Sequence, residues 1–244
     1  MEDIKTVRVN KYLSEVGYCS RRVADTLISE GKVTVNGVPA AIGLRITMND
    51  EVKVDGVTIS DSAERHVYIA FNKPVGIVCT TDTELEKDNI IDYIKFPRRI
   101  FPIGRLDKDS EGLIILTSDG DIVNKILRSK NNHEKEYLVT VNKPIKRGFI
   151  EGMGNGVLVL GTMTNKCKVE QKGKCSFKIV LTQGLNRQIR RMCQRFGYKV
   201  TKLKRIRIMN IHLDIPTGQW KYLTELELKE ILHLVSNSSK THTE

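Results

Sequence analysis

Residues 103–120 read IGRLDKDSEGLIILTSDG, a polar loop that runs directly into the apolar run Leu113–Leu116. Four consecutive aliphatic residues after a glycine predict a strand that is buried on both faces. Asp107 lies in the loop, close to Arg105. Burial at the base of a loop disfavours a charged carboxylate, but a neighbouring cation offsets this effect and keeps the carboxylate ionised. Such a group can act as a nucleophile or as a base.

Asp109 and Glu111 are the other carboxylates of this loop. Two carboxylates about 5 to 9 Å apart form the acid–base pair of glycosidases. Carboxylates so close together within one turn are more typical of caps and solvated charges. We therefore interpret Asp109 and Glu111 as caps or solvated charges, and Asp107 as the candidate for chemistry.

The composition favours a folded protein of the cytoplasm. The chain has 244 residues, of which 40% are hydrophobic, enough for one large domain or for a small module joined to a larger one. No apolar run approaches the roughly 20 residues that span a bilayer, and the first residues lack the apolar segment of a secretion signal. The five cysteines and five histidines are scattered, without a CxxC or HExxH motif. Neither a disulfide framework nor a metal site is expected.

Positive charge is concentrated late in the chain. The formal charge is +11, and residues 182–208 hold nine Lys and Arg residues but no Asp or Glu. Residues 186–196 fit a short amphipathic helix with Ile189 and Met192 on its apolar face. A solvated basic face without a partner is one interpretation. Because uncompensated cations repel one another, a partner that carries phosphates is the interpretation that we favour.

The first 55 or so residues predict a small module of two helices and a β unit. Val9 and Leu13 recur at helical spacing, and Ser20 is suited to cap a second helix that ends at Gly31. The predicted β segments are Lys32–Gly37 and Asp50–Gly56.

This module, VRVNKYLSEVGYCSRRVADTLISEGKVTVNG at residues 7–37, resembles the S4 domain, a small RNA-binding module. The SRR, ADTLI and VNG motifs and the later VDG occur in the order of that family. The resemblance implies that the second helix and the turn after it contact RNA. The other interpretation is that Arg21 and Arg22 only solvate the start of the second helix. The residues assigned to RNA contact are Ser20, Arg21, Arg22 and Lys32.

A larger domain is expected after a polar linker. The expected limits are 1–60 for the first domain, 61–66 for the linker, 67–236 for the second domain and 237–244 for a disordered tail. In the second domain strands outnumber helices and are interrupted irregularly, which predicts an α+β fold with a mixed, mostly antiparallel sheet. Its last helix is expected at 224–235, where Thr224 and Glu227 can form a capping box.

Motifs of common hydrolases, ATPases and dehydrogenases, such as GxSxG and GxxxxGK[ST], are absent. Four other motifs resemble, in order, the catalytic region of pseudouridine synthases of the RsuA and RluA type. With an S4 domain in front, the pattern is similar to the RsuA branch, and within it to the F type of large-subunit enzymes. One departure from the RluA branch is that Asn186 and Gln188 surround Arg187 where that branch carries a histidine. The four motifs are FNKPVGIVCTT at 71–81, GRLDKDSEGLIILTSDG at 104–120, KEY at 135–137 and GLNRQIRRM at 184–192.

The resemblance implies three catalytic residues. Asp107 would attack the target uridine, so that the glycosidic bond to N1 breaks and uracil rejoins the sugar through C5. Tyr137 would stack on the base, and Arg190 would be the cation paired with Asp107. Whether Asp107 attacks the sugar or the ring, and which of Asp107 and Tyr137 moves the C5 proton, stays open. No cofactor is expected, because the reaction exchanges two nucleoside isomers.

The resemblance also implies residues that hold RNA near the catalytic group. Arg105 and Arg187 would grip phosphate or the flipped nucleotide, and Ile189 would pack under the base. Lys135 and Glu136 are interpreted as residues of the fold. The complete RNA-binding set expected in this domain is Arg105, Leu106, Lys108, Arg187, Gln188 and Ile189.

The expected partner is structured RNA, a stem-loop of 23S ribosomal RNA, with a transfer RNA as a second candidate. A uridine within a stem must leave the base stack before it can react. The protein is expected to act as a monomer, without metal or membrane. Two rival functions stay open: an RNA-binding or assembly factor without chemistry, and a glycosidase that releases the free base.

Overall fold

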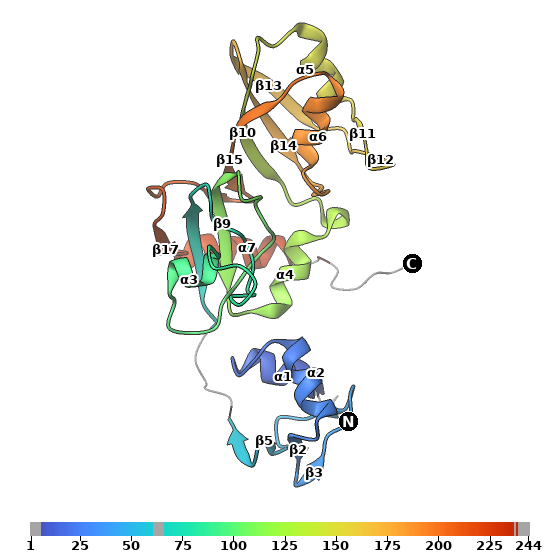
Figure 1. The fold of residues 1–244 in the computed structure, drawn as a ribbon, viewed down its shortest axis with the longest axis vertical. Helices are drawn as coiled ribbons and strands as arrows, with labels where there is room; N and C mark the ends of the chain where they lie inside the picture. The colour runs from blue at the N-terminus through green and yellow to red at the C-terminus, as the bar shows by residue number, and fades with distance from the viewer. Residues whose placement is uncertain (1–5, 61–65, 237, 239–244) are drawn as a thin grey trace. The chain divides into compact units, whose positions relative to one another are not determined.

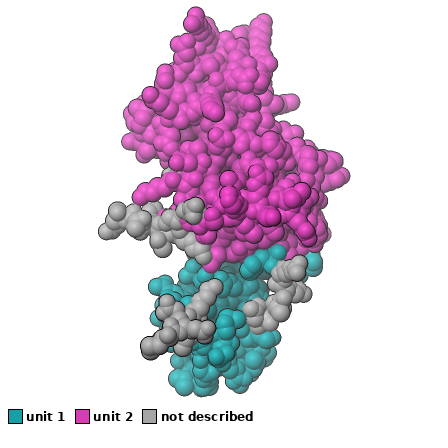
Figure 2. Space-filling view, turned by 180° about the vertical axis from the view of Figure 1, so that it is seen from behind, with its two compact units in different colours: residues 1–66, 97–99 teal, residues 67–96, 100–244 magenta. Residues whose placement is uncertain are grey.

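The computed structural model describes residues 6–60, 66–236 and 238. The chain divides into two compact units, residues 1–66 with 97–99 and residues 67–96 with 100–244 (Figure 2). Except for His66 and Ser238, the expected linker and tail lie outside the described residues. The domain limits that we expected therefore stay predictions.

The first unit packs two helices against a small antiparallel sheet (Figure 1). Ser20 Oγ accepts a hydrogen bond from the backbone N–H of Val23 at 3.2 Å, which confirms the predicted cap. Val9, Leu13 and Ile28 contribute to its core. Its helices are α1 (Val9–Glu15) and α2 (Arg21–Ser29). Its sheet has the order β3 (Val38–Pro39), β2 (Val33–Val35), β5 (Val52–Val54) and β6 (Val57–Ile59), and β1 (Val7–Arg8) pairs with β4 (Arg45–Ile46).

The second unit is organised around one mixed sheet. Every strand pair in it is antiparallel except the pair β9 with β15, so the predicted α+β class with a mostly antiparallel sheet is confirmed. The strands run in the order β13 (Lys168–Gly173), β14 (Ser176–Leu181), β10 (Lys135–Val141), β15 (Val200–Ile208), β9 (Glu111–Thr117), β7 (Tyr68–Lys73) and β17 (Trp220–Tyr222). Two short strands extend it, β8 (Phe101–Pro102) on β9 and β16 (Ile211–His212) on β15.

The helices of this unit lie on both halves of the sheet (Figure 1). The last one has the predicted capping box between Thr224 and Glu227. Asp119 accepts a hydrogen bond from the backbone of Asp121 at 2.8 Å and starts a helix that the sequence did not suggest. The helices are α3 (Ile90–Ile94), α4 (Gly120–Leu127), α5 (Arg147–Gly154), α6 (Gln188–Arg195) and α7 (Glu225–Leu234), with a 3-10 turn at Ser129–Asn131 and a hairpin of β11 (Leu158–Val159) and β12 (Thr162–Met163).

Strand β9 is buried on both faces, as its sequence predicts. Residues 113–116 are all 0% exposed. Leu113 and Ile115 belong to the core under α4 and α7, while Ile114 and Leu116 belong to the core under α3. A third core lies in the other half of the sheet, under α5 and α6.

The two halves of the sheet meet at a short parallel seam between β9 and β15. Only two positions pair there, Glu111 with Lys204 and Gly112 with Arg205. Gly112 has φ +107°, and a Cβ at this position would lie 2.3 Å from the carbonyl oxygen of Arg205. Glycine is therefore required for this close backbone approach. The loop that holds Asp107 enters β9 at this seam.

Candidate active site

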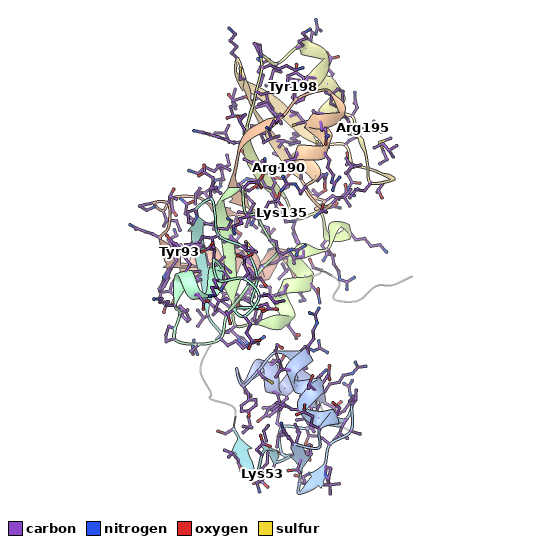
Figure 3. The ribbon with its side chains drawn as sticks, viewed as in Figure 1. Lys53, Tyr93, Lys135, Arg190, Arg195 and Tyr198 are labelled. Atoms are coloured by element: carbon purple, nitrogen blue, oxygen red, sulfur yellow. The ribbon has the colours of Figure 1, made fainter. Side chains whose placement is uncertain are left out.

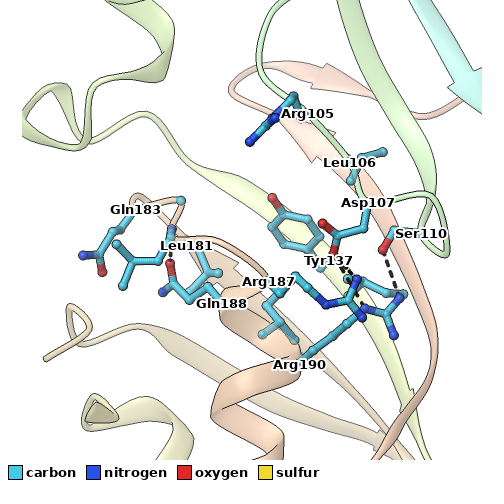
Figure 4. Close-up of a pocket in the computed structure, with 14 residues that line it drawn as sticks. Arg105, Leu106, Asp107, Ser110, Tyr137, Leu181, Gln183, Arg187, Gln188 and Arg190 are labelled. Atoms are coloured by element: carbon cyan, nitrogen blue, oxygen red, sulfur yellow. Dashed lines mark hydrogen bonds and ion pairs between the residues drawn. The ribbon is translucent and has the colours of Figure 1, made fainter. Parts of the chain in front are cut away.

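The carboxylate of Asp107 faces two arginines and an aromatic ring (Figure 4). Asp107 lies in a turn closed by a 3.0 Å hydrogen bond from the backbone of Ser110 to the Asp107 carbonyl. Strand β10 supplies Tyr137, and helix α6 with the residue before it supplies Arg190 and Arg187. Three distant segments of the sequence therefore meet where the halves of the sheet join.

Both arginines lie within ion-pair distance of Asp107. Asp107 Oδ2 is 3.4 Å from Arg187 Nη1 and 3.7 Å from Arg190 Nε. The Asp107 side chain is 29% exposed, against 13% for Arg190. Arg190 thus lies where the sequence analysis expected the paired cation. Arg187, which we expected only to hold RNA, lies nearer still.

Asp109, which we interpreted as a cap or solvated charge, is 49% exposed and also pairs with these arginines. Arg187 donates to both of its carboxylate oxygens at 3.1 Å, and Arg190 Nη2 lies 3.3 Å from Oδ1. Partial burial acts to raise the pKa of Asp109, but the Arg187 hydrogen bond and the two guanidinium charges outweigh it and lower that pKa below its ordinary value. The i, i+2 spacing with Asp107 in one tight turn was the signal for this shared pairing.

Helix α6 is anchored so that its first turn faces the loop of Asp107. Arg187, at the N-cap, has a left-handed φ of +49°. Gln188 is 5% exposed, and its Oε1 accepts the backbone N–H of Leu185 at 2.9 Å. Arg190 Nη2 donates to the Asp109 carbonyl at 2.9 Å and to Ser110 Oγ at 3.0 Å. Gln188, which we expected to bind RNA, therefore has its amide committed within the protein.

A cavity of about 120 Å³ opens between these groups. Tyr137 and Asp107 line it together with the apolar side chains of Leu106, Leu181, Ile189 and Leu203. An aromatic ring, apolar walls and one carboxylate suit a planar base with a reacting centre beside it. Leu106 and Ile189 line this cavity, and their expected contacts with RNA stay predictions.

A larger cavity of about 690 Å³ shares Tyr137, Arg105, Asp107 and Arg187 with the first. Two buried cations line it, Lys135 and Arg205, at 7% and 3% exposure. Burial and the nearby Arg205 charge lower the pKa of Lys135 to about 8. Figure 3 shows Lys135 and Arg190 in the region where the halves of the unit meet.

Neither cation was assigned to the site from the sequence. Lys135 was interpreted as a residue of the fold, although its i, i+2 spacing with Tyr137 on a strand was a signal that both face the same cavity. Arg205 gave no such signal, because its place opposite Tyr137 depends on the register of β10 and β15.

The remaining expected RNA contacts lie elsewhere. Lys108 Nζ is 3.4 Å from Glu86 Oε1 and 3.6 Å from Asp88 Oδ2, so carboxylates already face it. In the first unit, Arg21 and Arg22 are exposed, and Lys32 pairs with Glu30 at 2.8 Å.

Among the described residues, no cluster of His, Cys, Asp and Glu could hold a metal ion, and no helix is long and apolar enough to cross a membrane.

Comparisons with known proteins match both units. Residues 67–195 match the family model described as RNA pseudouridylate synthase, and residues 7–52 match the S4 domain. The dual-specificity RNA pseudouridine synthase RluF of Salmonella typhi is 58% identical over 236 residues, which cover 96% of this chain and 81% of that protein.

More distant relatives give the same result. The ribosomal large subunit pseudouridine synthase B of Bacillus subtilis is 32% identical over 239 residues, covering 94% of this chain and 97% of that protein. A crystal structure described as pseudouridylate synthase superimposes with a TM-score of 0.68 at 28% identity, covering 92% of this chain and 99% of the other.

Proposed function

The chain belongs to the RNA pseudouridylate synthase family, and from this premise we propose that it converts a uridine of large-subunit ribosomal RNA into pseudouridine. The name of the Bacillus subtilis relative supports this choice of RNA. The Salmonella relative is named as dual-specificity, which supports a second RNA substrate, and we propose a transfer RNA in that place.

The observation that carries the proposal is the carboxylate of Asp107, held 3.4 and 3.7 Å from two guanidinium groups in a cavity that Tyr137 also lines. Asp107 attacks the target nucleotide, the bond from C1′ to N1 breaks, and uracil turns within the cavity. C5 then bonds to C1′, the bond to Asp107 breaks, and C5 releases its proton to water while N1 takes one up, so substrate and product are isomers and no co-reactant is consumed.

The cavity explains why the free base is not lost between the two steps. Its apolar walls and the Tyr137 ring can retain uracil while it turns, and the arginines compensate the charge that develops next to Asp107. Extrusion of the target from an RNA stem costs about a few kcal/mol, which phosphate contacts to the cations around the site can offset.

The enzyme also needs an oligomeric state, a compartment and RNA contacts outside the cavities. We propose that the enzyme acts as a monomer. We place the reaction in the cytoplasm, where ribosomal RNA is available, and assign further RNA contacts to the exposed Arg21 and Arg22 of the S4 unit.

The test uses a stem-loop RNA that carries tritium at C5 of uridine, because each isomerisation releases that tritium to water. Asp107→Asn should reduce release by at least about 1,000-fold while RNA affinity is retained, since the amide is a poor nucleophile and base. Asp88→Asn, which changes an exposed carboxylate outside the cavities, is the matched control. Full turnover by Asp107→Asn would remove this residue from the mechanism.

The same assay separates the rival functions. An RNA-binding factor without chemistry would release no tritium even as the wild-type protein. A glycosidase would produce free uracil, which chromatography detects. We expect tritium release, pseudouridine in the digested RNA and no free uracil.

A further inference from the structure

Lys135, Tyr137 and Arg205 converge on one cavity. Lys135 and Tyr137 are two residues apart on β10, and Tyr137 is paired with Arg205 on the neighbouring strand β15. The Arg205 guanidinium lies 6.0 Å from the centre of the Tyr137 ring. Lys135 and Arg205 line the larger cavity and not the smaller one, whereas Asp107 and Tyr137 line both.

The two cations have no anionic partner among the described residues. Lys135 Nζ donates to the His133 carbonyl at 3.2 Å, and Arg205 Nε donates to the Leu113 carbonyl at 2.6 Å. Arg205 Nη2 is buried without any hydrogen-bond partner. Buried charges are normally paired, because an isolated charge in the protein interior is strongly unfavourable.

The groups around Lys135 do not supply the missing charge. The titratable groups that face Lys135 or line its cavity are Arg205, His133, Tyr137, Cys79, Arg105, Arg187 and Asp107. Asp107 is the single carboxylate among the described residues that line the cavity, and its ion pairs are with Arg187 and Arg190. Two like charges therefore stay buried next to an open space of about 690 Å³.

We propose that Lys135 and Arg205 form an anion site for a phosphate group of the RNA strand adjacent to the target nucleotide. This inference rests on the proposed function, because the strand must pass Asp107. Arg105, Thr80 and Thr81 line the same cavity and supply further donors. A phosphate is favoured over a carbonyl oxygen of the uracil because two buried cations that, within the described part of the chain, donate only to backbone carbonyls call for an anion, and a phosphate is charged whereas a uracil carbonyl is neutral.

The first test compares Lys135→Met, Lys135→Arg and the control Lys168→Met, which removes an exposed lysine of β13 in the same sheet. Lys135→Met should lower kcat/KM for the stem-loop about tenfold, chiefly through KM, because one charge-assisted phosphate contact is lost. Lys135→Arg should keep most of the activity. The control should stay within about twofold of the wild type.

The pH dependence adds a result that a merely structural role would not produce. Wild-type kcat/KM should fall above about pH 8, as Lys135 loses its proton. This decline should be absent in Lys135→Arg, whose guanidinium stays charged. A decline that is identical in both proteins would overturn the assignment of Lys135.

The second test identifies the phosphate. Stem-loops are made with one neutral methylphosphonate at a time on either side of the target uridine, and their binding and turnover are measured. One substitution should weaken the wild type about tenfold but leave Lys135→Met unchanged, because that contact is already lost. Equal sensitivity of both proteins at every position, or a loss in kcat alone, would overturn the proposal.

Binding and turnover also separate this inference from the proposed function. If the wild type releases no tritium but the methylphosphonate effect on RNA binding depends on Lys135, the phosphate site holds and the isomerase proposal fails. If tritium is released and no methylphosphonate effect depends on Lys135, the isomerase proposal holds and the phosphate site fails.

Discussion

Two pairs of cations line the candidate site, and they differ in what compensates them. Arg187 and Arg190 contact the carboxylates of Asp107 and Asp109. Lys135 and Arg205 are more deeply buried, yet among the described residues their hydrogen-bond acceptors are backbone carbonyl oxygens. The charges of the first pair are compensated by carboxylates of the protein. The charges of the second pair are not, and we propose that an anion of the substrate compensates them.

The difference follows from where each pair stands in the fold. The first pair comes from α6 and meets a polar loop that carries two acidic residues. The second projects from adjacent strands among apolar neighbours such as Leu181 and Ile208. Lys73 shows that a lysine at 0% exposure can also be satisfied locally, since its Nζ donates to the carbonyls of Pro74 and Ile77 at 2.8 and 2.7 Å.

The largest effect is expected from a change that disturbs both pairs at once. Gly112→Ala places a Cβ against the backbone of Arg205 at the seam and at a positive φ, so it should lower the free energy of unfolding by about 4 kcal/mol. Urea unfolding measures this. Gly148→Ala is the control, because Gly148 is helical, its Cβ has open space, and alanine favours a helix. Equal midpoints of urea unfolding for the two variants would show that β9 and β15 can move apart at the seam without loss of stability.

Removal of one member of the compensated pair should mainly affect catalysis. Arg190→Met takes away a cation from Asp107 and donors to the Asp109 carbonyl and Ser110, so kcat should fall about 100- to 1,000-fold. Arg191→Met is the neighbouring control, since Arg191 binds Asn186 instead. A loss confined to KM would indicate that Arg190 binds RNA and does not support Asp107.

Removal of one member of the uncompensated pair should stabilise the free protein. The folded-state pKa of Lys135 is about 8, below its ordinary 10.5, so the unfolded chain holds the proton more tightly between these values. Wild-type stability should therefore rise by about 3 kcal/mol from pH 8 to pH 10.5, and Lys135→Met should lack this rise. Unfolding free energies of both proteins at pH 7 and pH 10.5 test it. Parallel pH profiles would mean that Lys135 is compensated after all.

The smallest effect is expected at Asp109. Its pKa is lowered in the folded state, so its ion pairs add stability above the unfolded pKa and lose it as the pH falls through the folded one. Because the side chain is 49% exposed, the contribution should be about 0.5 kcal/mol. Asp109→Asn should have a lower free energy of unfolding than the wild type at pH 6, and this difference should shrink as the pH falls and Asp109 is protonated. A difference that does not change with pH would point to packing instead of charge.

The sequence alone determined the features that depend on neighbours along the chain. Ser20 and Thr224 cap their helices as expected, and the apolar run 113–116 is fully buried. The ordered motifs predicted the family, and with it the neighbourhood of Asp107, Tyr137 and Arg190. These features rest on local hydrogen bonding and hydrophobic periodicity, which a sequence displays directly.

Only the tertiary structure decided which charges meet. Asp109 is 78 residues from Arg187, and Arg205 is 92 residues from the Leu113 carbonyl that it contacts. The register of β10 on β15 sets Arg205 opposite Tyr137, and the seam at Gly112 brings the loop of Asp107 to α6. Such contacts depend on how strands pair across the sheet, and a single residue of slippage would turn each side chain to the opposite face.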